Sequence, residues 1–453
     1  MKKYFFFLTL LLTITEVTNA GQDQSQNKAN ILPYPITQYR MANGLNVVTV
    51  PYDSPGLAAF YIVMRVGSRD EIEAGKTGFA HFFEHMMFRG TEKYSSDQYS
   101  LALKSTGASA NANTSLDRTL YHMTGSAASL DKMFELESDR FMNLKFSLQD
   151  LKSEAGAVKG EYTKNSASPY EQLDEKLNEV AFTKHTYQHT TMGFFKDVVD
   201  MPNQYEYSQE FFKRFYKPEY ATILVVGDVT PEQIKALSEK YFSKWERGNY
   251  VSNIPVEPVQ TETRYAHVEK ANFPPVVSLN FKAPAYNDQQ IDMHAIDLLN
   301  AILFSEKSDL YNKLVVKEEK VRNINGGGNN SRDPYLVEIQ ASLVDAKDMQ
   351  YVKDEIMKAI ELMKTKPVDA KVLADAKSRM KYSFAMGLDN PGSIAESLAN
   401  YIWVTGNPES INRAYQMYEK VTPQDIMMVA NKYFVTSGLT IATISADKTC
   451  PIK

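Results

Sequence analysis

The stretch His81-Phe82-Phe83-Glu84-His85 is the most informative part of this chain of 453 residues. On a helix, residues four positions apart lie on one face, so both imidazoles can bind one metal ion. Glu84 lies beside His85 and can reach a water molecule on that metal without being a ligand itself. Two neutral nitrogen ligands, a carboxylate and an open coordination position are typical of a catalytic zinc site. The H-x-x-E-H order therefore predicts metal-assisted peptide hydrolysis.

The length and composition are those of a soluble globular protein with two or three domains. Hydrophobic residues make up 43% of the chain and charged residues 23%, which is ordinary for folded domains. The net charge of -5 gives no reason to expect nucleic acid or an anionic membrane as a partner.

The N-terminus has the pattern of a signal peptide. Lys2 and Lys3 precede a mostly apolar run, Tyr4 to Ile14, which is too short to span a bilayer. Small residues end at Ala20, so we expect residues 1–20 to be removed and no membrane span to remain. The single cysteine, Cys450, excludes an internal disulfide. These features predict an exported protein, most readily a bacterial periplasmic enzyme.

Residues 21–32 are rich in Gln, Asn and Ser and predict a disordered leader. Hydrophobic periodicity then divides residues 33–250 into strands and helices. We expect the runs at 45–50 and 57–66 to form a hairpin or paired strands, with further strands at 119–124 and 222–226. The expected helices are 78–88, 130–143, 148–163 and one that Pro231 opens.

The second half of the chain resembles the first in content. Residues 251–272 are proline-rich with little helical period and predict a linker. Beyond it, residues 273–448 contain strand patterns at 276–282 and 335–343, and helix patterns at 289–303, 308–319 and 349–363. Asn329-Asn330-Ser331-Arg332-Asp333 also echoes Asn113-Thr114-Ser115-Leu116-Asp117. We therefore predict an α+β fold of two structurally related domains, each a mainly antiparallel sheet packed with helices. The second domain has no H-x-x-E-H.

Two histidines alone bind zinc weakly, so a third protein ligand is expected. Glu154 and Glu161 lie seven positions apart on the predicted helix 148–163. Seven residues are about two helical turns, so both carboxylates lie on one face. One could bind the metal while the other hydrogen-bonds a ligand histidine. Spacing alone does not decide between them.

Nearly the whole chain resembles the pitrilysin/insulinase-type metallopeptidases, in particular the half-length group related to mitochondrial processing peptidase. The resemblance is carried by Gly78 to Thr91, Gly107 to Tyr121, Ser138-Asp139-Arg140, Tyr216-Lys217-Pro218 and Val225 to Asp228. It implies that Glu161 is the third ligand of one zinc ion and that Glu154 orients a ligand histidine.

The resemblance also implies a mechanism and a mode of substrate binding. Zinc held by His81, His85 and Glu161 would activate water, and Glu84 would act as the general base. Residues 109–114 resemble the family's edge strand, to which a peptide adds as a further strand. Asn111 and Ala112 would contact the peptide backbone.

The chain departs from self-sufficient family members, which carry an arginine and a tyrosine in the second half. The matching positions here are Val315 and either Arg322 or Asn323. The departure predicts a homologous partner subunit that supplies the missing pair, in a heterodimer or a homodimer. Gly326 to Asn329 is expected to be a flexible loop, although the processing-peptidase group uses a glycine-rich loop for substrate.

The alternative to a zinc endopeptidase is a non-catalytic scaffold or binding subunit of the same fold. Scaffold copies tend to lose motif residues, whereas His81, Glu84, His85 and Glu161 are all present here. The ligand set favours zinc over other divalent ions. We therefore predict a zinc endopeptidase that acts on peptides or unfolded segments.

Overall fold

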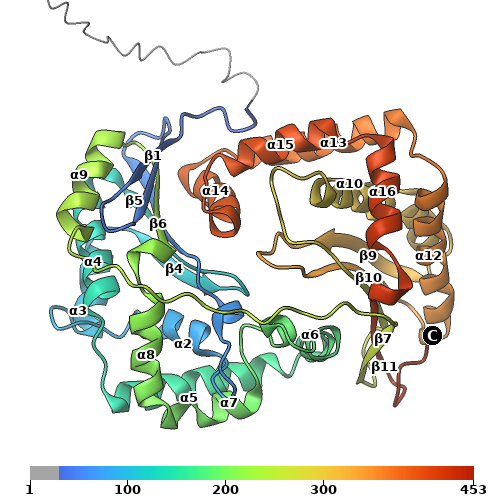
Figure 1. Ribbon diagram of the computed structural model, residues 1–453, viewed down its shortest axis with the longest axis horizontal. Helices are drawn as coiled ribbons and strands as arrows, with labels where there is room; N and C mark the ends of the chain where they lie inside the picture. Colours follow the sequence, from blue (N-terminus) through green and yellow to red (C-terminus); the bar gives the residue numbers. More distant parts are fainter. Residues whose placement is uncertain (1–29) are drawn as a thin grey trace, which may run out of the picture.

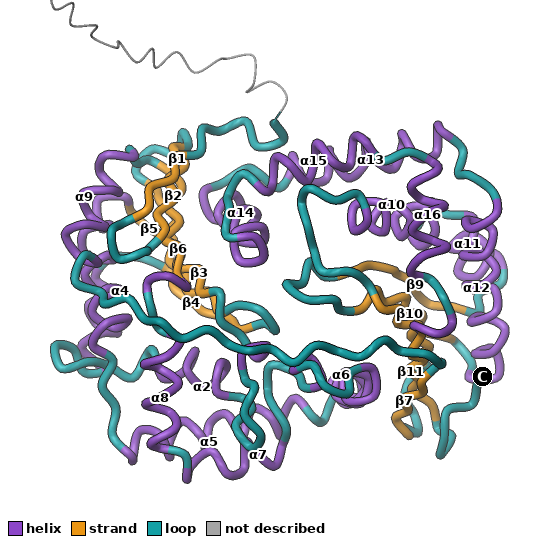
Figure 2. The backbone as a smooth tube through the Cα atoms, viewed as in Figure 1, coloured by secondary structure: helices purple, strands orange, loops and turns teal. Residues whose placement is uncertain are grey.

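The computed structural model describes residues 30–453. Two sheets form the centres of two halves, and helices cover the outer faces of both (Figures 1 and 2). The predicted signal peptide and residues 21–29 of the predicted leader lie outside the described residues.

The first sheet has the spatial strand order β1-β2-β6-β3-β5-β4. Its strands are β1 (Thr37–Arg40), β2 (Asn46–Pro51), β3 (Leu57–Met64), β4 (Ser109–Thr114), β5 (Thr119–Ser126) and β6 (Ala221–Gly227). Strands β2 and β6 are parallel and the other neighbours are antiparallel. β4 therefore lies at an edge, with one side of its backbone free to pair.

Helices of the first half pack on one face of this sheet around a core rich in Phe, Tyr and Met. They are α2 (Phe79–Met86), α3 (Ser96–Ser105), α4 (Leu130–Asn143), α5 (Leu148–Asn165), α7 (Phe195–Asp200), α8 (Tyr205–Phe215) and α9 (Pro231–Phe242). The short 3₁₀ turn η1 (Ser68–Asp70) lies between β3 and α2, and η3 (Thr186–Gln188) precedes α7.

The second sheet repeats the connectivity of the first. Its spatial order is β7-β11-β8-β10-β9, again with one parallel pair, β7 and β11. The strands are β7 (Arg264–Glu269), β8 (Val276–Lys282), β9 (Val321–Gly328), β10 (Leu336–Leu343) and β11 (Leu439–Ser445). When β1 is left out, the remaining strands of each sheet can be numbered in chain order from the first to the fifth. Both sheets then have the same spatial order, which is first, fifth, second, fourth, third. The predicted α+β fold of two related domains is confirmed, and β9 is the counterpart of β4.

Helices of the second half surround a separate aliphatic core. They are α10 (Asp292–Phe304), α11 (Asp309–Tyr311), α12 (Met349–Thr365), α13 (Ala370–Met386), α15 (Ser410–Lys420) and α16 (Pro423–Tyr433), and a π-helical turn η6 (Asn312–Lys317) follows α11.

One helix of each half packs against the sheet of the other half (Figure 1). α14 (Pro391–Thr405) packs Ile394 and Leu398 against the free face of the first sheet. α6 (Pro169–Ala181) packs Leu173 and Leu177 against the second sheet. Because apolar surface of both sheets is covered by this exchange, separating the halves would expose both.

Three predictions from the sequence are wrong. β2 and β3 do not pair with each other, because β6 lies between them and pairs with both. The predicted linker at 251–272 is too long, because β7 (Arg264–Glu269) lies within it and pairs with β11. The predicted leader extends too far, because Ile31 and Leu32 are buried with the α14 cluster.

The glycine-rich stretch is also not a loop. Gly326, Gly327 and Gly328 belong to β9 and pair in register with Ile339, Glu338 and Val337 of β10. A Cβ at Gly326 would lie 2.4 Å from the Phe304 ring, so close packing of α10 on the strand favours glycine there.

Within residues 30–453, no helix is both long and apolar enough to span a bilayer.

Candidate metal centre

The helix α2 carries the H-x-x-E-H motif at the centre of the first half. Phe82, Phe83 and Met86 are fully buried and anchor the helix in the aromatic core. This packing fixes the opposite face, from which His81 and His85 project toward α5. The helix begins after Gly78, whose φ of +90° is the left-handed conformation that glycine adopts without strain.

His81, His85 and Glu161 come together in the structure. One donor atom from each lies within 4.8 Å of the other two, and among the described residues this is the one such group of three or more. Oε2 of Glu161 lies 3.6 Å from Nε2 of His81 and 3.4 Å from Nε2 of His85. Two atoms about 2.1 Å from one zinc ion at the tetrahedral angle are about 3.4 Å apart. The donor set therefore fits zinc.

The protonation state of His81 also suits a metal ligand. Burial, together with the neighbouring His85, lowers the pKa of His81 to about 4. The imidazole is therefore neutral at neutral pH, which leaves a nitrogen lone pair free to bind metal.

Glu154 lies on the far side of His85 from Glu161. Its Oε2 atom is 3.4 Å from Nδ1 of His85, and its other oxygen forms an ion pair with Arg89. The side chain is buried. The two nitrogens of His85 therefore face different carboxylates, Nδ1 that of Glu154 and Nε2 that of Glu161.

Glu84 points toward the edge strand β4. Its Oε2 atom accepts a hydrogen bond of 2.7 Å from the Thr114 hydroxyl. Burial raises the pKa of the Glu84 carboxyl, although the bond from Thr114 opposes this. A carboxylate with a raised pKa beside a metal site is suited to accept a proton from water.

β4 is an edge strand, as the sequence predicted for residues 109–114. Asn111 is exposed on the face of the sheet that α14 shares, whereas the Ala112 side chain is buried toward α2. Neighbouring residues of a strand turn their backbone N–H and C=O groups to opposite sides, so one of the two offers these groups at the open edge, and an added strand would run past both.

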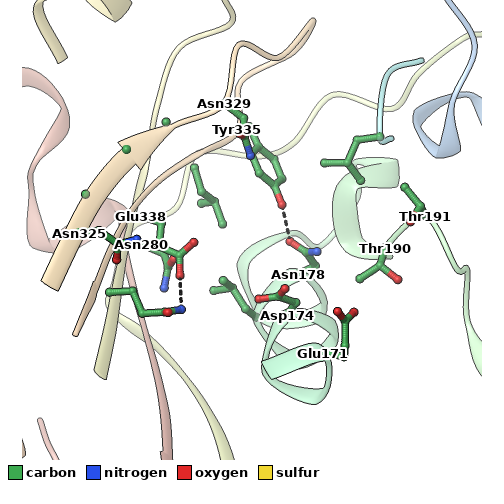
Figure 3. Close-up of a pocket in the computed structure, with 17 residues that line it drawn as sticks. Glu171, Asp174, Asn178, Thr190, Thr191, Asn280, Asn325, Asn329, Tyr335 and Glu338 are labelled. Carbon is green, nitrogen blue, oxygen red and sulfur yellow. Dashed lines mark hydrogen bonds between the residues drawn. The ribbon is translucent and has the colours of Figure 1, made fainter. Parts of the chain in front are cut away.

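An acidic cavity of about 500 Å³ lies between α6 and the strands of the second sheet (Figure 3). Glu171 and Asp174 enter it from α6, and Glu338 enters from β10. Of the described residues that line it, none is a lysine, arginine or histidine. Leu116, two residues beyond Thr114, forms part of the wall. The turn that follows the edge strand β4 therefore borders the cavity.

Burial in this acidic cavity shifts the pKa of Asp174. Burial, with the facing carboxylates of Glu338 and Glu171, raises the pKa of Asp174 to about 7. The sequence analysis did not single out these residues. Glu171, Asp174 and Glu175 recur at three- and four-residue spacing on one helix, and that acidic face was the available signal.

The positions expected to carry arginine and tyrosine do not carry them. Val315 lies in η6 and packs partly buried against the core of the second half. Arg322 and Asn323 are exposed on β9, and Arg322 donates to the Leu343 carbonyl at 3.3 Å. None of the three offers a donor fixed in a site.

Two family profiles match the chain. The insulinase (peptidase family M16) profile matches residues 47–193, and the profile of the peptidase M16 inactive domain matches residues 204–380. The first contains the H-x-x-E-H helix, and together they span most of both halves. The chain belongs to the insulinase (M16) peptidase family. The resemblance to this family is confirmed.

Relatives of similar length match nearly the whole chain. The zinc protease PqqE of Helicobacter pylori is 28% identical over 402 residues, which cover 87% of this chain and 89% of the relative. The beta subunit of the mitochondrial processing peptidase of Saccharomyces cerevisiae is 20% identical, with 91% of each chain covered. A crystal structure of a protease from Helicobacter pylori superposes with a TM-score of 0.84 at 26% identity, covering 91% of this chain and 99% of that one.

Proposed function

We propose that the protein is a zinc-dependent endopeptidase that hydrolyses peptides or unfolded segments. The observation that carries the proposal is the convergence of His81, His85 and Glu161 beside Glu84, at an open sheet edge. A metal centre alone is compatible with many reactions, whereas an adjacent edge strand is a binding site for an extended peptide. The family membership supports the same conclusion.

The residues of the site would have separate roles in binding the metal ion and in moving a proton. His81, His85 and Glu161 would hold the ion, with Glu154 orienting His85. Zinc, when bound, supplies a Lewis acid that polarises a carbonyl and lowers the pKa of water. Glu84 accepts the proton of the attacking water and delivers it to the leaving nitrogen.

The substrate would lie along β4. The peptide would run past Asn111 and Ala112 and pair with the backbone groups that β4 turns to its open edge, a mode that recognises main chain more than side chains. Selectivity for a side chain would come from the acidic cavity, where Glu171, Asp174 and Glu338 favour a lysine or arginine of the substrate.

A second subunit would complete the site. Val315, and either Arg322 or Asn323, stand at the positions where self-sufficient members of the family carry an arginine and a tyrosine. The relative from yeast is named as a subunit. We therefore propose a homologous partner that supplies this pair, as a heterodimer or homodimer. The signal-like residues 1–20 support export, to the periplasm of a bacterium.

The deciding experiment is Glu84→Gln in the purified mature chain, tested with and without the partner. The variant should retain one zinc per chain and lose peptidase activity by roughly a hundredfold or more, because only the base is removed. Glu92→Gln is the matched control, since Glu92 is exposed and pairs with Lys145. Unchanged cleavage by Glu84→Gln would remove Glu84 from the mechanism.

The alternative is a non-catalytic scaffold of the same fold. The match of residues 204–380 to the inactive-domain profile is compatible with this alternative. A scaffold would show no zinc-dependent cleavage with any partner. Zinc-dependent turnover that chelation abolishes and added zinc restores would exclude it.

A further inference from the structure

Glu71 is a buried carboxylate that the mechanism above does not use. Its side chain is only 2% exposed. Oε2 accepts a hydrogen bond of 2.7 Å from the backbone N–H of Gly78, and Oε1 accepts one of 2.6 Å from that of Ala80. Both donors belong to the start of α2. The neighbouring imidazole of His189 lies 3.9 Å away, and burial lowers the pKa of that ring.

The start of α2 needs such an acceptor. The first N–H groups of a helix have no partner within the helix and are usually satisfied by a capping side chain. The residue before α2 is Gly78, which has no side chain to cap with. Glu71 takes that place, because its two carboxyl oxygens accept from the N–H groups of Gly78 and Ala80, while burial raises the pKa of this carboxyl to about 8. His81 follows Ala80 directly, so Glu71 fixes the turn from which His81 projects.

The segment before Glu71 joins the two halves of the chain. Nε of Arg69 lies 2.5 Å from Oδ2 of Asp333 and 3.6 Å from Oδ1 of Asp117. Asp117 lies in the turn between β4 and β5, and Asp333 lies in the corresponding turn between β9 and β10. The hydroxyl of Thr186 donates to the Arg69 carbonyl at 2.6 Å. Arg69 therefore clamps two equivalent turns, one from each half.

We propose that Glu71 is a positioning residue, which sets the zinc-bearing helix in place relative to the clamp that Arg69 forms between the two halves. Asp333 holds Arg69, which belongs to η1, and η1 leads directly to Glu71. The two hydrogen bonds that Glu71 accepts then fix the start of α2, from which His81 projects. The half without the motif then does more than cover the first sheet. It helps to fix a ligand of the metal.

Glu71→Gln tests the proposal. The amide keeps the size of the side chain but replaces one acceptor oxygen with a group that faces an N–H donor. We expect zinc affinity to fall about tenfold, as for groups that orient metal ligands, and the visible spectrum of the cobalt-substituted protein to change. Glu73→Gln is the matched control, because Glu73 lies in the same loop but pairs with Arg214, and it should bind zinc as the wild type does.

A variant in the other half tests the link between the halves. Asp333→Asn should weaken zinc binding in the same direction but less, because it acts through Arg69. A purely structural role would lower the unfolding temperature of Glu71→Gln and leave zinc affinity and the cobalt spectrum unchanged, and that result would overturn the proposal. Should Glu71→Gln fail to fold, Glu71→Asp carries the same readouts, since it keeps the carboxyl group but shortens its reach.

The inference rests on the proposed zinc site, and the two can fail separately. A wild-type protein that binds no zinc would overturn both. A wild type that binds zinc and cleaves peptides, with Glu71→Gln equal to it in affinity and spectrum, would overturn the positioning role alone.

Discussion

The hydroxyl of Thr114 donates a hydrogen bond of 2.7 Å to Glu84. Thr114 is the last residue of β4, so the proposed base is attached to the strand on which a peptide would lie. The bond favours the ionised form of Glu84 and opposes the rise in pKa that burial causes. This hydrogen bond therefore fixes the proposed base relative to the strand on which the substrate would lie.

Thr114→Val should lower kcat by roughly tenfold while KM and zinc content stay close to the wild type, because a hydrogen bond to a charged group is lost. Thr114→Ser keeps the hydroxyl and should retain most of the activity. Steady-state kinetics on one peptide measure both. Equal kcat values for Thr114→Val and the wild type would show that the bond does not position Glu84.

The elements of this fold could be predicted where their cause is local. The sequence bounds of α4 and of β8 match the structure, since periodicity within a helix or strand determines them. The insertion of β6 between β2 and β3, and the exchange of α6 and α14, depend on contacts between distant residues. Periodicity carries no information on such pairings.

The same distinction between local patterns and contacts of distant residues applies to the candidate site. Spacing placed Glu154 and Glu161 on one helical face, and resemblance assigned their roles. Glu71 was missed because it lies in a loop and binds backbone groups, which leave no residue pattern. The one available signal was a helix start at Gly78 without a capping side chain, which implies an acceptor from elsewhere.

Glu161→Gln and Glu154→Gln should separate the two glutamates by zinc affinity. Removal of the charge at Glu161 should weaken binding more, because its oxygen faces both Nε2 atoms. Glu154→Gln should cost roughly ten- to a hundredfold, the usual range for groups that orient a ligand histidine. Competition with a chelating indicator measures both constants. A larger loss for Glu154→Gln would reverse the assignment.

The buried pair of Glu137 and Arg140 should make the first half sensitive to the loss of one of the two charges. Their charged groups are 2.6 Å apart and both side chains are 2% exposed. Arg140→Met leaves Glu137 as a buried charge with one bond, from the Tyr99 hydroxyl, and should cost about 3–5 kcal/mol.

Replacing both residues should cost less than replacing the arginine alone. The double variant Glu137→Gln, Arg140→Met leaves no buried charge, so its urea midpoint should lie between those of the wild type and Arg140→Met. Circular dichroism reports the transitions. A double variant that is less stable than Arg140→Met would contradict this account.

Asp174 should make the preference for basic substrates depend on pH. Its pKa is raised to about 7 in the folded protein, so the carboxyl is largely protonated below that pH and charged above it. Cleavage of a peptide with lysine or arginine, relative to a neutral analogue, should therefore rise between pH 6 and 8. In Asp174→Asn this rise should be much reduced, while zinc content is unchanged.

The same shift affects stability with the opposite sign. A carboxyl whose folded pKa is raised stabilises the fold at low pH, and this contribution is lost as pH increases through about 7. Asp174→Asn should therefore gain stability relative to the wild type as the pH is raised from 5 to 8. Urea midpoints at the two pH values test this, with Glu232→Gln on α9 as an exposed control. If Asp174→Asn keeps both the wild-type substrate preference and the wild-type pH dependence of stability, Asp174 does not titrate in the cavity.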